Sequence, residues 1–366
     1  MLIHFFKGNI THLTPRNISN YISHSGEEGF EKQLFLIANP SGILSNKDLN
    51  TYISLFKKTN SSCSYKIWVS SYEIIRIIFK IQKNDRIIFH SMIHPVTLRF
   101  LIYLVLYCRG LLSNTILVCW NLSDAIIQSD RLFIHIYNKI HYFFLKRFRQ
   151  ICLISKIDKE FFESKCKTNN AILLPLLTNG VKIQSVKYPK IGTDGTLRIM
   201  VSHSGWAHNN HIDSFRVLER FNTENIEIIC PLCYGDEDYI SRVVMEGQKM
   251  FGGKFKYFTE LMPYDEYVDY LNTHVAIYVT SADIQTGLGA ANILLRSGAR
   301  LFVGQNLLDS YKSMGVKVDS VNILKRIIFD ELKESVDDTL YRQNIEALSS
   351  FYDSNRIFEQ YKSILK

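Results

Sequence analysis

Short runs of apolar residues alternate with longer amphipathic stretches along the first half of the chain. Short apolar runs are typical of buried strands, and the stretches between them have the 3.6-residue period of helices. The predicted strands are 2–6, 34–38, 65–69, 86–90, 115–120, 151–154 and 171–174, and the predicted helices are 47–57, 73–80, 95–108, 132–149 and 158–166. This alternation predicts a parallel sheet covered by helices on both faces.

The same alternation restarts in the second half, after a segment at 185–195 that contains Pro and Gly and has no apolar period. The predicted strands are 197–201, 226–230, 255–257, 274–279 and 300–303, and the predicted helices include 212–221, 237–250, 263–271 and 288–297. A chain of 366 residues suits two domains. We therefore expect an α/β protein with two Rossmann-like, doubly wound domains facing a cleft, at 1–184 and 196–339, joined by a linker at 185–195. Residues 340–366 are expected to form helices that pack back across the cleft.

Composition narrows the class of protein. Hydrophobic residues make up 46% of the chain and charged residues 21%, which excludes a disordered protein. The net charge of +8 fits a phosphate-bearing ligand or an anionic membrane, and it is too diffuse to indicate nucleic acid. Seven irregularly spaced cysteines favour reduced thiols in the cytoplasm. The start of the chain does not read as a signal peptide, and no apolar run approaches the roughly 20 residues that span a bilayer, so we expect a soluble or peripheral protein.

Two loops carry the residues expected to bind a ligand. In the first, a predicted strand ends at Val201 and a loop of Ser, Gly, Asn and His leads into the helix 212–221. Small residues let a ligand approach the backbone, and the N-terminus of a helix binds phosphate through its N–H groups and partial positive charge. A glycine loop before the helix 288–297 repeats this arrangement. The predicted nucleotide-binding residues are Ser204, Gly205, Asn209, His211, Tyr234, Gln285, Thr286, Gly287 and Gly289.

Each loop also has an ordinary structural interpretation. Asn can cap the helix that follows the first loop, and a glycine in the second can serve close packing, since a lone G-x-G is a weak signal. The D-x-D motif at Asp236 and Asp238 could suggest a metal site. It stands at the start of a predicted helix, however, where acidic residues complement the helix dipole. The C-x-x-C at Cys230 and Cys233 has no second pair of ligands for zinc. We therefore expect no metal site at either motif.

The predicted helix 132–149 is both aromatic and basic. Its cations and phenylalanines suit a face lying on anionic lipid, and the alternative is a core helix with a solvated basic end. The residues in question are Lys139, Lys146, Arg147 and Arg149, with Phe143, Phe144 and Phe148.

The first loop, read as V-x-x-S-G-x-x-x-N-x-H from Val201 to His211, resembles the bacterial TDP-Fuc4NAc:lipid II Fuc4NAc transferases, a 4-alpha-L-fucosyltransferase family of enterobacterial common antigen synthesis. Further segments also resemble motifs of this family. They occur in the same order as in the family and are spread over most of the chain. They are Leu2-Ile3-His4, Phe89-His90 with Pro95, Ser155 with Asp158, Pro231 with Tyr234, Tyr264-Asp265-x-Tyr267 and Gln285-x-Gly287-Leu288-Gly289. Three motifs depart from the family. Its W-G-A-D is Asn121-Leu122-Ser123-Asp124 here, its N-S-G-D is His203-Ser204-Gly205-Trp206, and its Q-Q-G has Thr286 in second place.

The resemblance implies a GT-B glycosyltransferase that binds the donor in its C-terminal domain and the acceptor in its N-terminal domain. It implies a dTDP-activated deoxy-amino sugar as donor and an undecaprenyl-diphosphate-linked glycan as acceptor. It places the protein peripherally on the cytoplasmic face of the bacterial inner membrane, and we expect no metal or other cofactor. The departures point to the alternative of a catalytically degenerate scaffold that binds nucleotide or glycan.

An acceptor hydroxyl must lose its proton when it attacks the sugar, which requires a carboxylate or His in the N-terminal half. The candidates are Asp124, His90 and His12, with Asp158 behind them. Asp124 is favoured because it persists in a rewritten motif, although capping of the next turn is an alternative role. A retaining reaction needs no such base.

Overall fold

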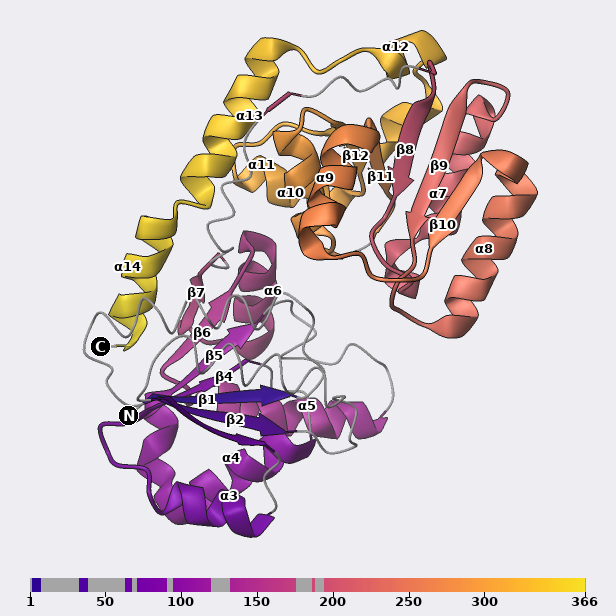
Figure 1. Ribbon diagram of the computed structural model, residues 1–366. Coiled ribbons are helices and arrows are strands. Elements are labelled where there is room, and N and C mark those ends of the chain that lie inside the picture. The colour runs from indigo at the N-terminus through magenta and orange to yellow at the C-terminus, as the bar shows by residue number, and fades with distance from the viewer. Residues whose placement is uncertain are drawn as a thin grey trace. The chain divides into compact units, whose positions relative to one another are not determined.

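The structure is a computed structural model that describes residues 2–7, 33–38, 63–67, 71–90, 95–119, 132–175, 186–187, 194–282 and 284–365. The chain forms two compact units. Unit 1 comprises Met1–Val181 together with Tyr352–Lys366, and unit 2 comprises Lys182–Phe351 (Figure 1). The chain therefore passes between the units twice, and the last helix belongs with the first half of the sequence.

Unit 1 is built on a seven-stranded sheet in the order β3-β2-β1-β4-β5-β6-β7, and every pair of neighbours is parallel. Strands β1 and β4 are neighbours at the switch point of this sheet. After β1 the chain adds β2 and β3 on one side, and after β4 it adds β5, β6 and β7 on the other side. The strands are β1 (Leu2–Lys7), β2 (Gln33–Ala38), β3 (Cys63–Ile67), β4 (Arg86–Phe89), β5 (Thr115–Cys119), β6 (Gln150–Leu153) and β7 (Ala171–Leu173).

Alternate residues of this sheet enter two separate cores, as the two-residue period of a strand requires. One face carries Ile3, Ile87 and Phe89 and is covered by α3 (Ser71–Ile78), α4 (Pro95–Cys108), α5 (Leu132–Leu145) and α6 (Lys156–Cys166). The other face carries Leu2 and Ile88 and packs against α14 (Ser354–Leu365). The apolar stripe of the last helix is therefore part of the core of unit 1.

Unit 2 repeats this plan with six parallel strands in the order β10-β9-β8-β11-β12-β13. The strands are β8 (Leu197–Val201), β9 (Ile226–Pro231), β10 (Phe255–Phe258), β11 (Ile277–Thr280), β12 (Arg300–Val303) and β13 (Asp319–Ser320). The helices are α7 (His211–Leu218), α8 (Glu237–Phe251), α9 (Tyr264–His274), α10 (Leu288–Arg296), α11 (Gln305–Ser313), α12 (Phe329–Lys333) and α13 (Asp338–Phe351).

Some sequence-based boundaries were wrong. Helix α5 ends at Leu145 rather than at 149. Phe144 and Phe148 are buried in the core of unit 1, as the core-helix alternative predicts for these two residues. Strand β11 begins at Ile277, because His274 closes α9 and stacks on Tyr270. The predicted helix 47–57 lies outside the described residues. In the described part of the chain, no helix has both the length and the apolar character needed to cross a membrane.

Candidate functional site

The site expected from the sequence lies at the point in the unit 2 sheet where β8 and β11 are neighbours. After β8 the chain moves to β9 and β10, and after β11 it moves to β12 and β13. Loops that leave neighbouring parallel strands in opposite directions open a crevice at the carboxyl ends of those strands, which is where ligands bind in such sheets. The two loops predicted to bind nucleotide, 202–210 and 281–287, leave from these two strands.

Ser202 connects the starts of these two loops. Its hydroxyl donates to the carbonyl oxygen of Asn209 at 3.1 Å and lies 3.0 Å from the Thr280 hydroxyl at the end of β11. Its backbone has a φ of 56°, a left-handed conformation that is unfavourable for a residue with a Cβ. A buried hydroxyl network therefore holds the first loop in a strained conformation.

Asn209, one of the predicted binding residues, stabilises the loop from inside. Its side-chain nitrogen donates to the carbonyl oxygen of Ser204 at 2.7 Å and to the Ser204 hydroxyl at 2.9 Å, and both residues are fully buried. This amide therefore shapes the loop around Ser204 and is not turned toward solvent.

Gly205 serves close packing. Its N–H donates to the carbonyl oxygen of Tyr234 at 2.8 Å, and a Cβ at this position would lie 2.2 Å from Cγ1 of Ile240. A Cβ on Gly235 would in turn lie 2.3 Å from the Gly205 backbone. The Gly205 N–H therefore already has an acceptor in the loop after β9, and the role of Gly205 in nucleotide binding stays a prediction.

The N-terminus of α7 is also occupied by groups of the protein. The His211 N–H donates to the Tyr239 hydroxyl at 3.1 Å, and Asp213 in the first turn adds a negative charge. The His211 ring is buried between Phe215 and Tyr239, where burial lowers its pKa to about 3, with smaller contributions from His203 and His208. His211 is therefore a neutral core side chain, and this helix end is a poor anion site.

The N-terminus of α10 has the opposite character. Gly287 precedes the helix with a φ of 72° and no side chain caps the helix start, while the first turn has no acidic residue. The first N–H groups of a helix lack partners within it and attract anions. A Cβ on Gly289 would meet no atom within 4 Å, so this turn faces open space. Of the two predicted phosphate cradles, the one at Gly287–Gly289 has the geometry for an anion.

His203 joins the two loops, and the sequence-based selection of site residues missed it. Its Nε2 atom lies 3.3 Å from the hydroxyl oxygens of both Ser204 and Thr286, and its Nδ1 atom lies 2.8 Å from the place a Cβ on Gly287 would take. In the described part of the chain, Nδ1 is buried without a hydrogen-bond partner. Burial lowers the pKa of His203 to about 4, with a further effect from His208, so the ring is neutral at pH 7. The available signal was that His203 replaces the first residue of the N-S-G-D motif.

Two tyrosines and a glutamine lie near His203 and the start of α10. The Tyr278 hydroxyl, fully buried at β11, would lie 2.8 Å from a Cβ on Gly287. Tyr234 is partly exposed, and its pKa is raised by burial although a hydrogen bond with Ser204 opposes the shift. Both amide atoms of Gln285 are buried and have no hydrogen-bond partner among the described residues. Polar atoms thus converge on the start of α10.

The loops after four strands of this sheet have no positive side chain. The segments 202–211, 232–236, 259–263 and 281–289, which follow β8, β9, β10 and β11, contain no Lys or Arg. In this unit, the charge of a bound diphosphate would therefore be offset by the dipole of α10 and by neutral donors such as His203.

In unit 1, His90 lies at the corresponding switch point, directly after β4 and beside β1. Its Nε2 atom is 3.1 Å from Nδ1 of His4, the two rings stack, and the His90 N–H donates to the carbonyl oxygen of Phe5. Burial and the adjacent His4 hold the pKa of His90 well below its usual value, so it is neutral and a weak base at pH 7. The other two candidate bases, Asp124 and His12, lie outside the described residues. Asp158 is on α6, where its N–H is bound by the Ser155 hydroxyl.

The acidic and cysteine motifs have structural roles in the described chain. Asp236 caps α8 by accepting a hydrogen bond from the Tyr239 N–H at 2.8 Å. Cys230 is buried in β9, and Cys233 donates to the carbonyl oxygen of Glu260. No group of three His, Cys, Asp or Glu side chains that could hold a metal occurs among the residues with described positions.

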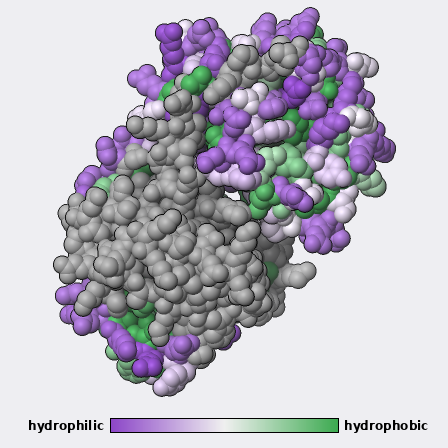
Figure 2. Space-filling model, viewed as in Figure 1, coloured by the Kyte–Doolittle hydropathy of each residue, from purple (hydrophilic) through white to green (hydrophobic). Residues whose placement is uncertain are grey.

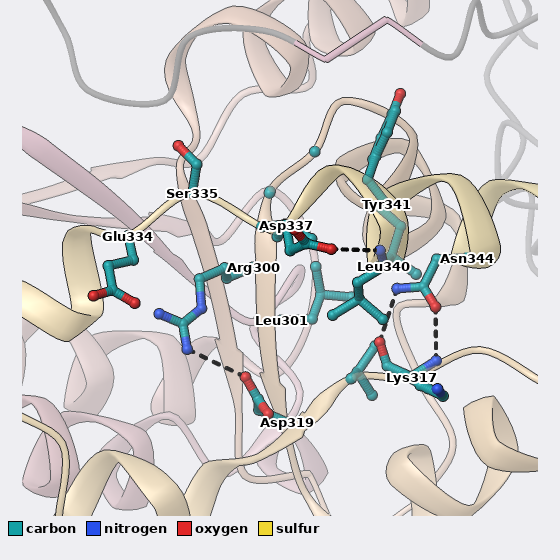
Figure 3. Close-up of a pocket in the computed structure, with 15 residues that line it drawn as sticks. Arg300, Leu301, Lys317, Asp319, Glu334, Ser335, Asp337, Leu340, Tyr341 and Asn344 are labelled. Atoms are coloured by element: carbon teal, nitrogen blue, oxygen red, sulfur yellow. Dashed lines mark hydrogen bonds and ion pairs between the residues drawn. The ribbon is translucent and has the colours of Figure 1, made fainter.

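A cavity of about 280 Å³ in unit 2 lies away from these loops (Figure 3). It is lined by Arg300 at the amino end of β12 and by Asp337, Tyr341 and Asn344 around α13. Arg300 pairs with Asp319 across it at 3.4 Å. Because ligands of such sheets bind at the carboxyl ends of the strands, this cavity is not the nucleotide site.

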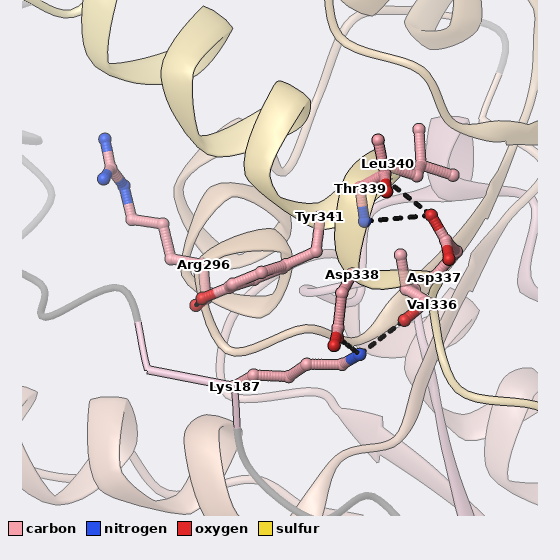
Figure 4. A network of polar contacts seen from close by, with 8 residues as sticks. All are labelled: Lys187, Arg296, Val336, Asp337, Asp338, Thr339, Leu340 and Tyr341. Atoms are coloured by element: carbon pink, nitrogen blue, oxygen red, sulfur yellow. Dashed lines mark hydrogen bonds and ion pairs between the residues drawn. The ribbon is translucent and has the colours of Figure 1, made fainter.

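Beside the cavity, the segment that enters unit 2 is tied to the start of α13 (Figure 4). The Lys187 ammonium pairs with Asp338 and donates to the carbonyl oxygen of Val336, while the Tyr341 hydroxyl donates to the carbonyl oxygen of Arg296. These contacts give the beginning of α13 a fixed place within unit 2.

Two doubly wound parallel sheets, each with a switch point in its strand order, are the architecture of a GT-B glycosyltransferase. Solved structures share this fold over 100% of the chain. A glycosyltransferase from Rickettsia africae has a TM-score of 0.62 at 11% identity and is covered to 98%. Anabaena Alr3699/HepE in complex with UDP-glucose has a TM-score of 0.69 at 10% identity and is covered to 98%. The lipopolysaccharide outer core galactosyltransferase WaaB has a TM-score of 0.63 at 12% identity and is covered to 99%.

The chain belongs to the 4-alpha-L-fucosyltransferase family, glycosyl transferase group 56, whose model matches residues 43–318. This match confirms the resemblance inferred from the motifs, and the protein is a glycosyltransferase. The matched region includes both loops at the β8/β11 switch point.

Proposed function

We propose that the protein transfers a deoxy-amino sugar of the Fuc4NAc type from a dTDP-sugar to an undecaprenyl-diphosphate-linked glycan. The reaction would take place at the cytoplasmic face of the bacterial inner membrane, during synthesis of a surface polysaccharide such as an O-antigen or common antigen. Membership of the 4-alpha-L-fucosyltransferase family supports the reaction type, and the uncapped N-terminus of α10 supports a diphosphate leaving group.

The observation that carries this proposal is that the His203 ring lies beside both the Thr286 hydroxyl and Gly287, the glycine that precedes α10. The anomeric carbon–oxygen bond to the diphosphate breaks during transfer, and the leaving group gains negative charge. The N–H groups at the uncapped start of α10 would stabilise this charge, and the buried Nδ1 of His203 lies against Gly287. Gln285 and Tyr234 would then bind other parts of the donor, and the buried Ser204 would hold His203 and Tyr234 in place.

No divalent cation is part of the proposed mechanism. The D-x-D motif is used as a helix cap, so the leaving diphosphate would be stabilised by the helix dipole and by neutral hydrogen-bond donors. If configuration is inverted, Asp124 would accept the proton of the acceptor hydroxyl, with His90 and His12 as the alternative bases.

Sugar transfer from dTDP-Fuc4NAc to a lipid-linked acceptor, assayed in EDTA, tests the proposal. The wild-type protein should form product without added metal, and His203→Phe should lower kcat/KM by about tenfold or more because a donor to the leaving group is lost. His203→Asn, which restores the residue of the family motif, should retain more activity than His203→Phe. Failure to transfer sugar from any dTDP-sugar to lipid-linked acceptors would overturn the proposal and favour the scaffold alternative.

A further inference from the structure

The positive charge of the protein is concentrated in unit 1. Residues 1–181 with 352–366 contain 25 Lys and Arg against 13 Asp and Glu, a net charge of +12. Residues 182–351 contain 18 against 22, a net charge of −4. The two units of one chain therefore differ in sign, and an anionic partner of large area would be attracted to unit 1.

Helix α4 exposes the type of side chain that a surface helix normally buries. Phe100, Leu101 and Leu104 fill the core, and yet Ile102 and Leu106 on the opposite side are also aliphatic and solvent-exposed, Leu106 to 68%. Polar residues are expected on the outward stripe of a helix that covers a sheet, and a helix apolar all round is normally covered on all sides. At 14 residues α4 is too short to span a bilayer.

The apolar area extends beyond α4. Phe79, just after α3, is exposed and contacts the exposed Tyr107 of α4 with ring centroids 5.3 Å apart. Low in Figure 2, hydrophobic side chains reach the surface among hydrophilic ones in the region of α3 and α4.

Helix α5 lies on the same face of the sheet and repeats the pattern. Ile136, Ile140 and Phe143 recur at helical spacing and are exposed, Ile136 to 53%, while the opposite stripe of α5 is buried. The Arg147 guanidinium lies 3.7 Å from the centre of the Phe143 ring, and Lys139 is exposed between Ile136 and Ile140. We call the outward sides of α4 and α5, with Phe79, the α4–α5 surface.

The charges on this surface have one sign. The segments 86–123 and 131–157, which contain α4 and α5, have no Asp or Glu at all. Their described cations include Arg99 on α4 and Lys139, Lys146 and Arg147 on or after α5. On the neighbouring α3, Glu73 is half-buried, while Arg76 on this helix and Lys80 just after it are exposed.

Exposed aliphatic and aromatic side chains surrounded by cations match the interface of an anionic bilayer. The apolar groups enter the boundary between headgroups and acyl chains, and the cations bind lipid phosphates. We propose that the α4–α5 surface docks unit 1 onto a bilayer that contains anionic phospholipid. This inference deepens the proposed function, because it names the surface through which the enzyme would reach a lipid-linked acceptor.

Vesicle co-sedimentation of the full chain tests the inference. Wild-type protein should bind vesicles of phosphatidylcholine mixed with phosphatidylglycerol, bind phosphatidylcholine alone much more weakly, and be released by salt. The double variant Leu106→Glu/Ile140→Glu should bind the mixed vesicles about tenfold or more weakly, because two apolar anchors become anions. The matched control is Met245→Glu/Ile328→Glu, which changes two exposed apolar side chains of unit 2 and should bind like wild type.

Equal binding of the two double variants, or no dependence of wild-type binding on the anionic lipid, would overturn the inference. Thermal unfolding of both double variants checks that each is folded. If Leu106→Glu/Ile140→Glu is unfolded, the neutral change Leu106→Gln replaces it in the same comparison. Titration of dTDP separates this result from the proposed function, because neither double variant alters the loops at the β8/β11 switch point.

Discussion

The imidazole of His203 and the hydroxyl of Thr286 meet at 3.3 Å, although the two residues are 83 positions apart in the chain. One residue follows β8 and the other precedes α10, so their contact joins the two loops that leave the switch point of the unit 2 sheet. The neutral ring of His203 has its other nitrogen beside Gly287, where the helix dipole of α10 is positive. This arrangement connects the sequence motifs to the anion site that we propose.

The two glycines around the start of α10 should respond differently to a methyl group. Gly287→Ala places a Cβ 2.8 Å from both His203 Nδ1 and Tyr278 Oη at a left-handed φ, so we expect the dissociation constant for dTDP to rise at least about tenfold. Gly289→Ala meets no atom within 4 Å and should bind dTDP nearly as well as wild type. Calorimetric titration of both variants checks this, and equal affinities would contradict the placement of the diphosphate at this helix end.

Gly205 should matter for folding more than for chemistry. The Cβ of Gly205→Ala would lie 2.2 Å from Ile240, and we expect a loss of about 1–3 kcal/mol in the free energy of unfolding. The second change Ile240→Ala removes the clashing atoms, so the double variant should recover part of the lost stability. Gly253→Ala, which meets nothing within 4 Å, is the control. Denaturant unfolding that gives the same midpoint for Gly205→Ala and Gly253→Ala would show that the close approach is not needed.

The D-x-D motif should behave as a helix cap. Asp236→Ala removes the acceptor for the Tyr239 N–H and should cost about 1 kcal/mol of stability. Asp236→Asn keeps a capping oxygen and should cost less. Neither variant should alter the affinity for dTDP or make it depend on Mg²⁺, and a metal dependence that disappears in Asp236→Asn would instead identify a cation site.

Burial of His211 should make the protein less stable in acid. Its pKa is lowered from 6.5 to about 3, so an unfolded chain binds a proton at pH 5 that the folded chain does not. The contribution is fully present above pH 6.5 and is lost as the pH falls toward the folded value. This group alone should reduce the free energy of unfolding by about 2 kcal/mol between pH 7 and pH 5.

His211→Phe should flatten this pH dependence, because the aromatic ring can still pack between Phe215 and Tyr239. His135→Phe, at an exposed position on α5, should leave the slope as in wild type. Urea unfolding at a series of pH values measures both slopes, and identical slopes for wild type and His211→Phe would disprove the assignment.

Periodicity predicted most of the parallel strands because their apolar runs are short and bounded by polar residues, as at Ile226–Pro231. It placed the start of β11 too early, since Val275 and Ala276 lengthen the apolar run that leads into Ile277. It also extended α5 through Phe148, because an aromatic side chain in a turn and one in a helix look alike in sequence when both are buried.

The candidate site was only partly accessible to the same reasoning. Strand–loop–helix order and glycine content located both loops, and Gly287 was selected because small residues precede a helix there. Sequence alone did not distinguish a glycine needed for packing, Gly205, from one beside an open helix end, because the difference depends on the contacts of Ile240 and Tyr234. The sequence motifs did not identify His203, because its role depends on a contact with Thr286, which lies 83 residues further along the chain.

The account rests most directly on nucleotide binding at the start of α10, and calorimetric titration of the full chain with dTDP, UDP and GDP, in EDTA and then in Mg²⁺, measures it. We expect saturable binding of dTDP in EDTA, weaker binding of GDP, and loss of dTDP affinity in Gly287→Ala but not in Gly289→Ala. Absence of binding to every nucleotide, or binding that Gly287→Ala leaves unchanged, would contradict the account.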